Sequence, residues 1–296
     1  MKFRCFLALT AALALSSTAH ADLSFKDDSG REVRLTSPAR RIVTLAPHAT
    51  EILYAAGAGD RLVGTVDYSD YPPSAKALPR VGSYERLDLE TIAALKPDLV
   101  IAWETGNPAA QVEKLRALGL TVYASQPNRM EDIAAQLERF GELAGSETTA
   151  NAAAAQFRQR LETLRRSNAG KPSVRVFYQI WNNPLMTVGG PQIISDAIRL
   201  CGGENVFGKL HQMAPTVSVE AVLVADPEAI IATGMGDARP EWLNDWNKWK
   251  RMTAVKRNNL FHINPDIMQR HTPRILDGTA QLCADLDFAR SRRPQI

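Results

Sequence analysis

Six side chains that could hold a ligand stand directly after predicted strands, or in the loops that follow them. They are Tyr68, Tyr84, Trp103, Trp181, Asp266 and Arg270. In open parallel sheets, ligands bind beyond the carboxyl ends of the strands, so these loops are the natural place for a site. Four of the six are aromatic, which suits stacking on a large, flat, partly apolar ligand that a few polar contacts orient.

The aromatic candidates also have purely structural interpretations. Tyr68 could brace the proline-rich loop of residues 68–73, and Trp103 ends a buried strand, so it could belong to the core. His48 stands at the start of a helix, where capping or a structural role fits as well as ligand contact. The prediction of a ligand site therefore rests on the set of side chains.

For catalysis, the sequence offers no recognisable motif. It contains no G-x-S-x-G, no H-E-x-x-H, no Walker loop and no pairing of a cysteine nucleophile with histidine. The histidines of the mature chain, His48, His211, His262 and His271, show no metal-ligand spacing. We expect a binding protein without a dedicated metal site or permanently bound cofactor. A two-lobed α/β enzyme is the alternative from another class.

The elements that position these residues include one unit that occurs twice. Residues 87–103 (LDLETIAALKPDLVIAW) and 217–233 (VSVEAVLVADPEAIIAT) each read as a short helix, a proline turn and a buried strand. A unit used once per half predicts two similar lobes with a cleft between them. It also places Glu90 and Glu220 at equivalent points. Each could simply complement a helix dipole, but as an exposed pair they would suit a two-fold symmetric partner with basic sockets.

Strand–helix alternation predicts a mostly parallel α/β sheet in each half. Between the halves, residues 147–167 have helical apolar spacing and no proline, which predicts a helix some 30 Å long at about 1.5 Å per residue. Gly141 and Gly145 suggest a break before it, and residues 181–190 are expected to form a loop. The expected division is a leader at 1–21, an N-terminal lobe at 22–145, a connecting helix at 146–170 and a C-terminal lobe at 171–296.

An export signal accounts for the first 21 residues. Lys2 and Arg4 precede an apolar run at residues 6–15, and Ala19-His20-Ala21 forms an A-x-A cleavage site. The predicted destination is a periplasm, with secretion to the medium as the alternative. Of the 35 basic residues two lie in this leader, so the mature chain, with 32 acidic residues, is close to neutral. That balance argues against nucleic acid as a partner.

Two cysteines, Cys201 and Cys283, remain in the mature chain. In an oxidising compartment an even pair is expected to form a disulfide. The bond would close a loop of about 80 residues, which the chain-entropy model values at roughly 4–5 kcal/mol. Two buried free thiols are the alternative, and neither cysteine has the spacing of a metal or redox motif.

Several runs carry a resemblance to a known family: TLAPHATEILYAAGAG, YSDYPP, LDLETIAALKPDLVIAW, LCGGENVFG and TVSVEAVL. Together they resemble the periplasmic cobalamin-binding proteins of vitamin B12 ABC importers, within the class III solute-binding proteins. The resemblance covers nearly all of the mature chain. YSDYPP and LKPDLVIAW are the specific stretches, and the rest is shared with binding proteins for haem and iron-siderophores.

This resemblance implies a fold and a ligand site. The fold would be two Rossmann-like lobes joined by one rigid helix, with cobalamin between them as the transported ligand and little hinge closure. By position, the aromatic contacts to the corrinoid fall on Tyr68, Tyr84 and Trp103. The C-terminal lobe would contribute the loops at residues 180–182 and 266–270.

The same resemblance implies a partner. Glu90 and Glu220 fall on the two glutamates that dock a two-fold symmetric ABC permease, which works with its ATPase. Cys201 and Cys283 fall on the family disulfide. A monomeric, non-enzymatic carrier in the periplasm is therefore expected.

The chain departs from the family pattern at several stacking positions. Ala214 replaces a tryptophan, Tyr84 stands where a tryptophan is usual, and Ile267-Met268 replaces an aromatic pair. Lost stacking surface could lower affinity or change the preferred lower-ligand base. Haem or an incomplete corrinoid is therefore the alternative ligand.

Overall fold

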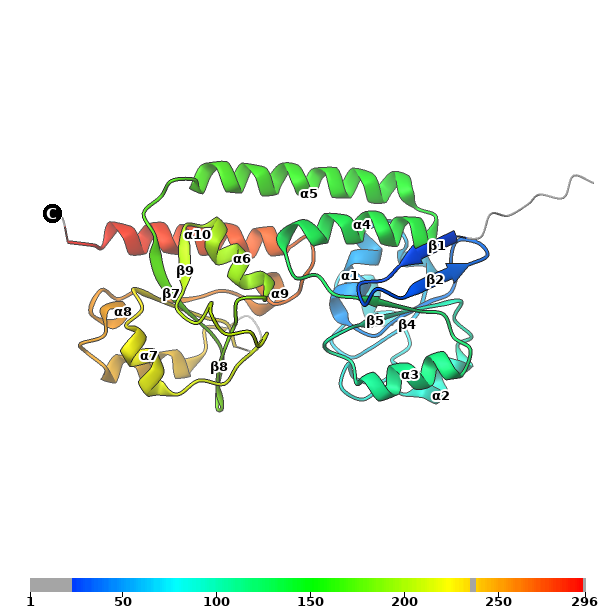
Figure 1. Ribbon diagram of the computed structural model, residues 1–296, viewed down its shortest axis with the longest axis horizontal. Helices are drawn as coiled ribbons and strands as arrows, with labels where there is room; N and C mark the ends of the chain where they lie inside the picture. Colours follow the sequence, from blue (N-terminus) through cyan, green and yellow to red (C-terminus); the bar gives the residue numbers. More distant parts are fainter. Residues whose placement is uncertain (1–22, 235–237, 295–296) are drawn as a thin grey trace, which may run out of the picture.

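Two α/β lobes lie side by side in the computed structural model of the protein, which describes residues 23–234 and 238–294 (Figure 1). The predicted leader lies outside the described residues. Helix α5 (Glu147–Asn168) runs along one side of both lobes, where the long connecting helix was expected. The predicted fold class, two α/β lobes joined by a long helix, is confirmed. None of the helices in the described ranges is long and apolar enough to cross a membrane.

The N-terminal lobe is built on four parallel strands in the order β4-β3-β5-β6. Alternate residues of β5 enter different hydrophobic clusters, Leu99 and Ile101 on one face and Val100 and Ala102 on the other. Both faces of the sheet are therefore covered, which explains why this strand reads as a continuous apolar run. The strands are β3 (Ile42–Thr44), β4 (Leu62–Thr65), β5 (Leu99–Trp103) and β6 (Val122–Ser125), preceded by the hairpin β1 (Leu23–Lys26) and β2 (Glu32–Leu35). The helices are α1 (Pro47–Ala55), α2 (Leu89–Ala94), α3 (Ala109–Ala117) and α4 (Met130–Ala144), with 3-10 turns at Gly59–Arg61 and Pro73–Ala77.

In the C-terminal lobe, the central strand β7 pairs in parallel with β10 and β9 and antiparallel with β8. The expected loop at residues 181–190 is wrong in part, because β7 continues to Asn182 and turns back as β8. The turn residues Asn183-Pro184 allow a tight hairpin there. The strands are β7 (Val174–Asn182), β8 (Leu185–Thr187), β9 (Gly203–Asn205), β10 (Ala229–Ala232) and β11 (Leu260–His262). The helices are α6 (Ile193–Leu200), α7 (Val219–Ala225), α8 (Thr253–Lys256), α9 (Pro265–Met268) and α10 (Ile275–Ser291), with a 3-10 helix at Glu241–Lys248.

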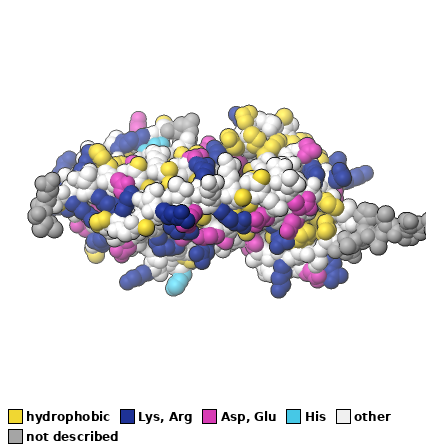
Figure 2. Space-filling model, turned by 90° about the horizontal axis from the view of Figure 1, so that it is seen from above, with side chains coloured by type: hydrophobic (Ala, Val, Ile, Leu, Met, Phe, Trp, Pro, Cys, Tyr) yellow, Lys and Arg dark blue, Asp and Glu magenta, His cyan; other side chains and the backbone are white. Residues whose placement is uncertain are grey.

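A single hydrophobic cluster extends from one lobe into the other beneath α4, α5, α6 and α10, and it includes Phe157 and Leu161 of α5. Gly141 does not break α4, contrary to expectation. A Cβ at this position would lie 2.2 Å from the Cβ of Ala150, so the glycine lets α4 and α5 approach closely. The break comes at Gly145, which ends α4 in the left-handed conformation at φ +64°. The solvent side of α5 carries mixed charges (Figure 2).

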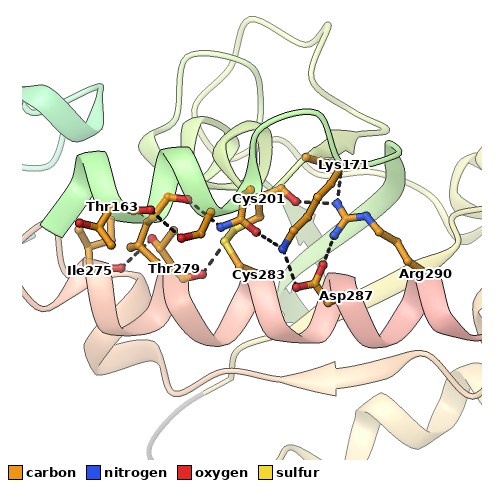
Figure 3. The surroundings of a disulfide bond; sticks show 12 residues. Thr163, Lys171, Cys201, Ile275, Thr279, Cys283, Asp287 and Arg290 are labelled. Atoms are coloured by element: carbon orange, nitrogen blue, oxygen red, sulfur yellow. Dashed lines mark hydrogen bonds and ion pairs between the residues drawn. A yellow bond between two sulfur atoms is a disulfide. The ribbon is translucent and has the colours of Figure 1, made fainter.

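The predicted disulfide is confirmed, since Cys201 after α6 and Cys283 in α10 are bonded to each other (Figure 3). Ion pairs and backbone contacts surround it. Arg290 donates to the Cys201 carbonyl oxygen at 2.6 Å and pairs with Asp287, which also binds Lys171 at 2.7 Å. These contacts join the chain after α5 to α6 and α10 and so fix one end of the connecting helix.

Candidate functional site

Two of the predicted aromatic contacts come together in the N-terminal lobe. The rings of Tyr84 and Trp103 have centroids 5.9 Å apart. Asn107, itself buried, holds both: its side-chain amide donates to the Tyr84 carbonyl at 2.9 Å, and its oxygen accepts from the Trp103 amide at 2.7 Å. The neighbouring Gly106 is required, because a Cβ there would lie 1.9 Å from the Trp103 ring. Sequence reasoning did not single out Asn107.

Tyr68 lies in the loop after β4, with a side chain that is 66% exposed and a backbone φ of +62°. This conformation is rare for a bulky residue and indicates that the loop is held in place. Arg80 provides the restraint, since its guanidinium donates to the carbonyls of Val66 and Ser69 at 3.0 and 3.1 Å. Burial, assisted by the charge of Glu85, raises the pKa of Tyr84, so its hydroxyl is neutral at neutral pH.

A pocket of about 270 Å³ also adjoins Trp103. Its lining includes charged side chains, namely Arg31, Glu104, Glu113 and Arg116. Such a lining does not suit the stacking of a flat, partly apolar ligand. We therefore place the candidate site on the side of Trp103 that meets Tyr84.

Asp266 and Arg270 extend from the C-terminal lobe toward the N-terminal one. Asn264 caps α9 by accepting from the Asp266 amide at 2.8 Å, which fixes the start of this short helix. One arm of the Arg270 guanidinium binds Asp266 at 3.0 Å, and the other binds Asp70 of the N-terminal lobe at 2.5 Å. The predicted polar contacts therefore lie where the two lobes meet.

Trp181 lies at the end of β7, and its described contact is local. The indole N–H donates to the Asn183 carbonyl at 3.0 Å, and the side chain is half-buried. The described contacts do not join Trp181 to the aromatic pair of the N-terminal lobe. Its place in the ligand site stays a prediction.

Two histidines form a buried contact between the lobes. His48 at the start of α1 and His271 after α9 have ring centroids 6.1 Å apart, and His48 also meets the edge of Trp103 at 5.4 Å. Burial, with the neighbouring His271, lowers the pKa of His48 to about 3. Burial also lowers the pKa of His271 to about 4, although the backbone of Pro127 opposes this. Both rings are neutral at neutral pH and continue the aromatic group from one lobe to the other.

A third cross-lobe contact was not predicted either. The guanidinium of Arg274, just before α10, binds both carboxylate oxygens of Glu51 in α1 at 2.6 Å. It also lies over the Tyr71 ring, 3.7 Å from its centroid. Glu51 is buried, so the pair is a structural link between the lobes. The loop YSDYPP is thus in contact with the C-terminal lobe at both Asp70 and Tyr71.

Glu90 and Glu220 lie away from this group. Both are exposed in the first turns of α2 and α7, which lie on the side of the molecule opposite α5 (Figure 1). Each helix begins with a side-chain cap, since Asp88 accepts from the Thr91 amide and Ser218 from the Ala221 amide. Hydrogen bonds from its own backbone and from Ser218 lower the pKa of Glu220, so it is ionised at neutral pH.

A resident metal has no evident place in the described part of the chain. No group of three or more His, Cys, Asp or Glu side chains in residues 23–234 and 238–294 could hold a metal ion. The arrangement is therefore one of aromatic faces and a few fixed charges between two lobes, which is what a binding site for a large organic ligand requires.

A family model described as periplasmic binding protein matches residues 42–267. The chain belongs to the periplasmic binding protein family, whose members are binding proteins and not enzymes. Its class III fold, predicted from the sequence, is confirmed.

Within this family, the chain is similar to vitamin B12-binding proteins. That of Vibrio cholerae serotype O1 is 41% identical over 256 residues, which is 86% of this chain and 92% of that protein. That of Yersinia pestis is 38% identical over 255 residues, covering 85% and 89%. The crystal structure of the periplasmic vitamin B12 binding protein of Vibrio cholerae superimposes with a TM-score of 0.79 at 40% identity, covering 86% of this chain and 98% of that one. A periplasmic heme-binding protein from Roseiflexus, 21% identical, has a TM-score of 0.72 over 86% of this chain and all of the other, and shows the fold alone.

Proposed function

We propose that this protein captures cobalamin, or a close corrinoid, in the periplasm and delivers it to an ABC importer. The proposal rests on three aromatic side chains of the N-terminal lobe, Tyr84, Trp103 and His48, whose rings contact one another. Through His48 this group contacts His271 of the C-terminal lobe, the residue that follows Arg270. The Trp103 indole N–H is buried and has no hydrogen-bond partner in the described part of the chain. Because this nitrogen is buried, the contact that Trp103 can offer a ligand is the exposed part of its half-buried ring, on which the corrin face could stack.

Ligand contacts are proposed for Tyr68, Tyr84, Trp103, Trp181, Asp266 and Arg270. The similarity to vitamin B12-binding proteins supports this choice of ligand. We also propose that the mature protein is a monomer with no resident cofactor. The proposed division is a leader at 1–21, lobes at 22–145 and 171–296, and a connecting helix at 146–170.

Titration of the purified mature protein with cyanocobalamin tests the ligand. We expect a dissociation constant in the micromolar range or tighter, and we expect Trp103→Ala to weaken binding at least about tenfold through lost stacking. Trp249→Ala is the matched control, because Trp249 is a partly exposed tryptophan of the C-terminal lobe outside the proposed site. Failure of cyanocobalamin to bind, together with a tyrosine-ligated spectrum on adding hemin, would refute the proposed ligand.

For delivery, we propose that Glu90 and Glu220 dock a two-fold symmetric permease. Their exposure on one side of the molecule, at equivalent helix starts in the two lobes, supports this role. The double variant Glu90→Lys/Glu220→Lys should bind cyanocobalamin as the wild type does but fail to support its uptake. The exposed control Glu241→Lys should retain both properties. Loss of ligand affinity in the double variant would show that the glutamates belong to the ligand site.

A further inference from the structure

We propose that Asp70 makes the site selective for a neutral, amide-bearing corrinoid over ligands that carry carboxylates, such as haem or corrinoid acids. This inference rests on the proposed function and names the substrate class of the same site. The feature behind it is a cluster of three charged side chains where the lobes meet, Asp70, Arg270 and Asp266, which we term the charge triad.

In the charge triad the two carboxylates are more exposed than the guanidinium that lies between them. Arg270 reaches Asp70 at 2.5 Å with one nitrogen and Asp266 at 3.0 Å with the other. The Arg270 side chain is only 15% exposed, whereas those of Asp70 and Asp266 are 42% and 41% exposed. One cation between two carboxylates leaves a net charge of −1. A ligand that arrives between the lobes therefore meets the negative partners before the positive one.

Asp70 is held in this position by its own loop. The preceding residue, Ser69, is fully buried, and its carbonyl accepts a hydrogen bond from Arg80 at 3.1 Å. Burial opposes ionisation of Asp70, but its hydrogen bond to Arg270 outweighs this and holds the pKa of the carboxyl below its ordinary value. Asp70 is thus a fixed anion at neutral pH.

The two ligand classes would respond to the triad differently. A carboxylate that approaches Arg270 has to displace Asp70, which exchanges one ion pair for another, and it is then repelled by Asp266. A carboxamide carries no charge, and its N–H groups can donate to the exposed carboxylate oxygens while Arg270 stays paired. Selectivity then arises from repulsion of the wrong ligand as well as attraction of the right one. The corrin ring of cobalamin bears amide side chains, whereas haem bears two propionates.

The test compares two nearly isosteric ligands, cyanocobalamin and its monocarboxylic acids, in which one amide has become a carboxylate. Dissociation constants are measured by titration for the wild type and for Asp70→Asn. We expect the wild type to bind the acids at least about tenfold more weakly than cyanocobalamin. The reason is the repulsion between the added ligand carboxylate and the carboxylate of Asp70 when the two are in contact. In Asp70→Asn the ratio of these two dissociation constants, which we term the affinity gap, should fall to about threefold or less. The control variant is Asp60→Asn, which removes an exposed carboxylate of the same lobe in the turn Gly59–Arg61. It should keep the affinity gap of the wild type.

Hemin serves as a second probe and separates this inference from the proposed function. If the wild type binds no cyanocobalamin but Asp70→Asn binds hemin about tenfold more tightly than the wild type, the proposed function fails, and of the inference only the repulsion of carboxylate-bearing ligands by Asp70 stands. If Asp70→Asn changes the affinities for cyanocobalamin, its acids and hemin by the same factor, or leaves the gap at its wild-type value, Asp70 does not discriminate and the inference is wrong.

Discussion

Lowering the pH from 7 to 5 should destabilise the protein through His48 and His271, which are buried between the lobes. Burial, reinforced for His48 by the neighbouring imidazole, lowers their pKa values to about 3 and about 4 in the folded protein. In the unfolded chain a histidine titrates near a pKa of about 6.5. The folded state therefore keeps both rings neutral at a pH where the unfolded chain binds protons.

The sign follows from this difference in proton binding. Because the folded pKa lies below the unfolded one, the unfolded chain holds more protons in the interval between them. Stability is therefore lost as the pH falls from about 6.5 toward the folded pKa values. Between pH 7 and pH 5 the loss is about 2 kcal/mol for each imidazole and about 4 kcal/mol for the pair.

Urea unfolding at pH 7 and pH 5 measures this loss directly. The variant His48→Gln/His271→Gln lacks both imidazoles, so its free energy of unfolding should fall by about 4 kcal/mol less than that of the wild type over this range. His211→Gln, which removes an exposed histidine, should behave as the wild type does. The reasoning is refuted if the double variant loses as much stability as the wild type, or if NMR shows either buried ring titrating near a pKa of 6.5.

Two further predictions concern the cross-lobe pair of Glu51 with Arg274 and the disulfide within the C-terminal lobe. Arg274→Met leaves the carboxylate of Glu51 buried without its cation, so urea unfolding at pH 7 should show a loss of about 3 kcal/mol. A loss below about 1 kcal/mol would mean that water reaches Glu51 in the variant. Replacing both disulfide cysteines, Cys201→Ala/Cys283→Ala, should lower the free energy of unfolding by roughly 4–5 kcal/mol and make it insensitive to reductant. Unchanged stability in that variant would refute this value, because it would mean that the disulfide does not lower the entropy of the unfolded chain.

The amino-acid sequence by itself determined the elements and the two-lobe plan. Buried strands such as β5 read as continuous apolar runs because both faces of the sheet are covered, and α5 is recognisable from local helical spacing. The repeated segment marks equivalent helix starts at Glu90 and Glu220, each with a side-chain cap encoded within three residues. These features depend on neighbours along the chain, so the sequence alone carries them.

Only the tertiary structure decided which side chains meet between the lobes. Asp70 and Arg270 are 200 positions apart, and Glu51 and Arg274 are 223 apart, so no spacing in the sequence pairs them. Their pairing depends on where the fold places α1 relative to the residue that precedes α10, and on the Arg80 contacts that hold the loop of Asp70. The role of Gly141 is also visible only in the tertiary structure, because the glycine is needed where α4 and α5 approach each other closely. The sequence therefore predicted the loops that we propose for the ligand site, and three-dimensional packing decided the charges that those loops present.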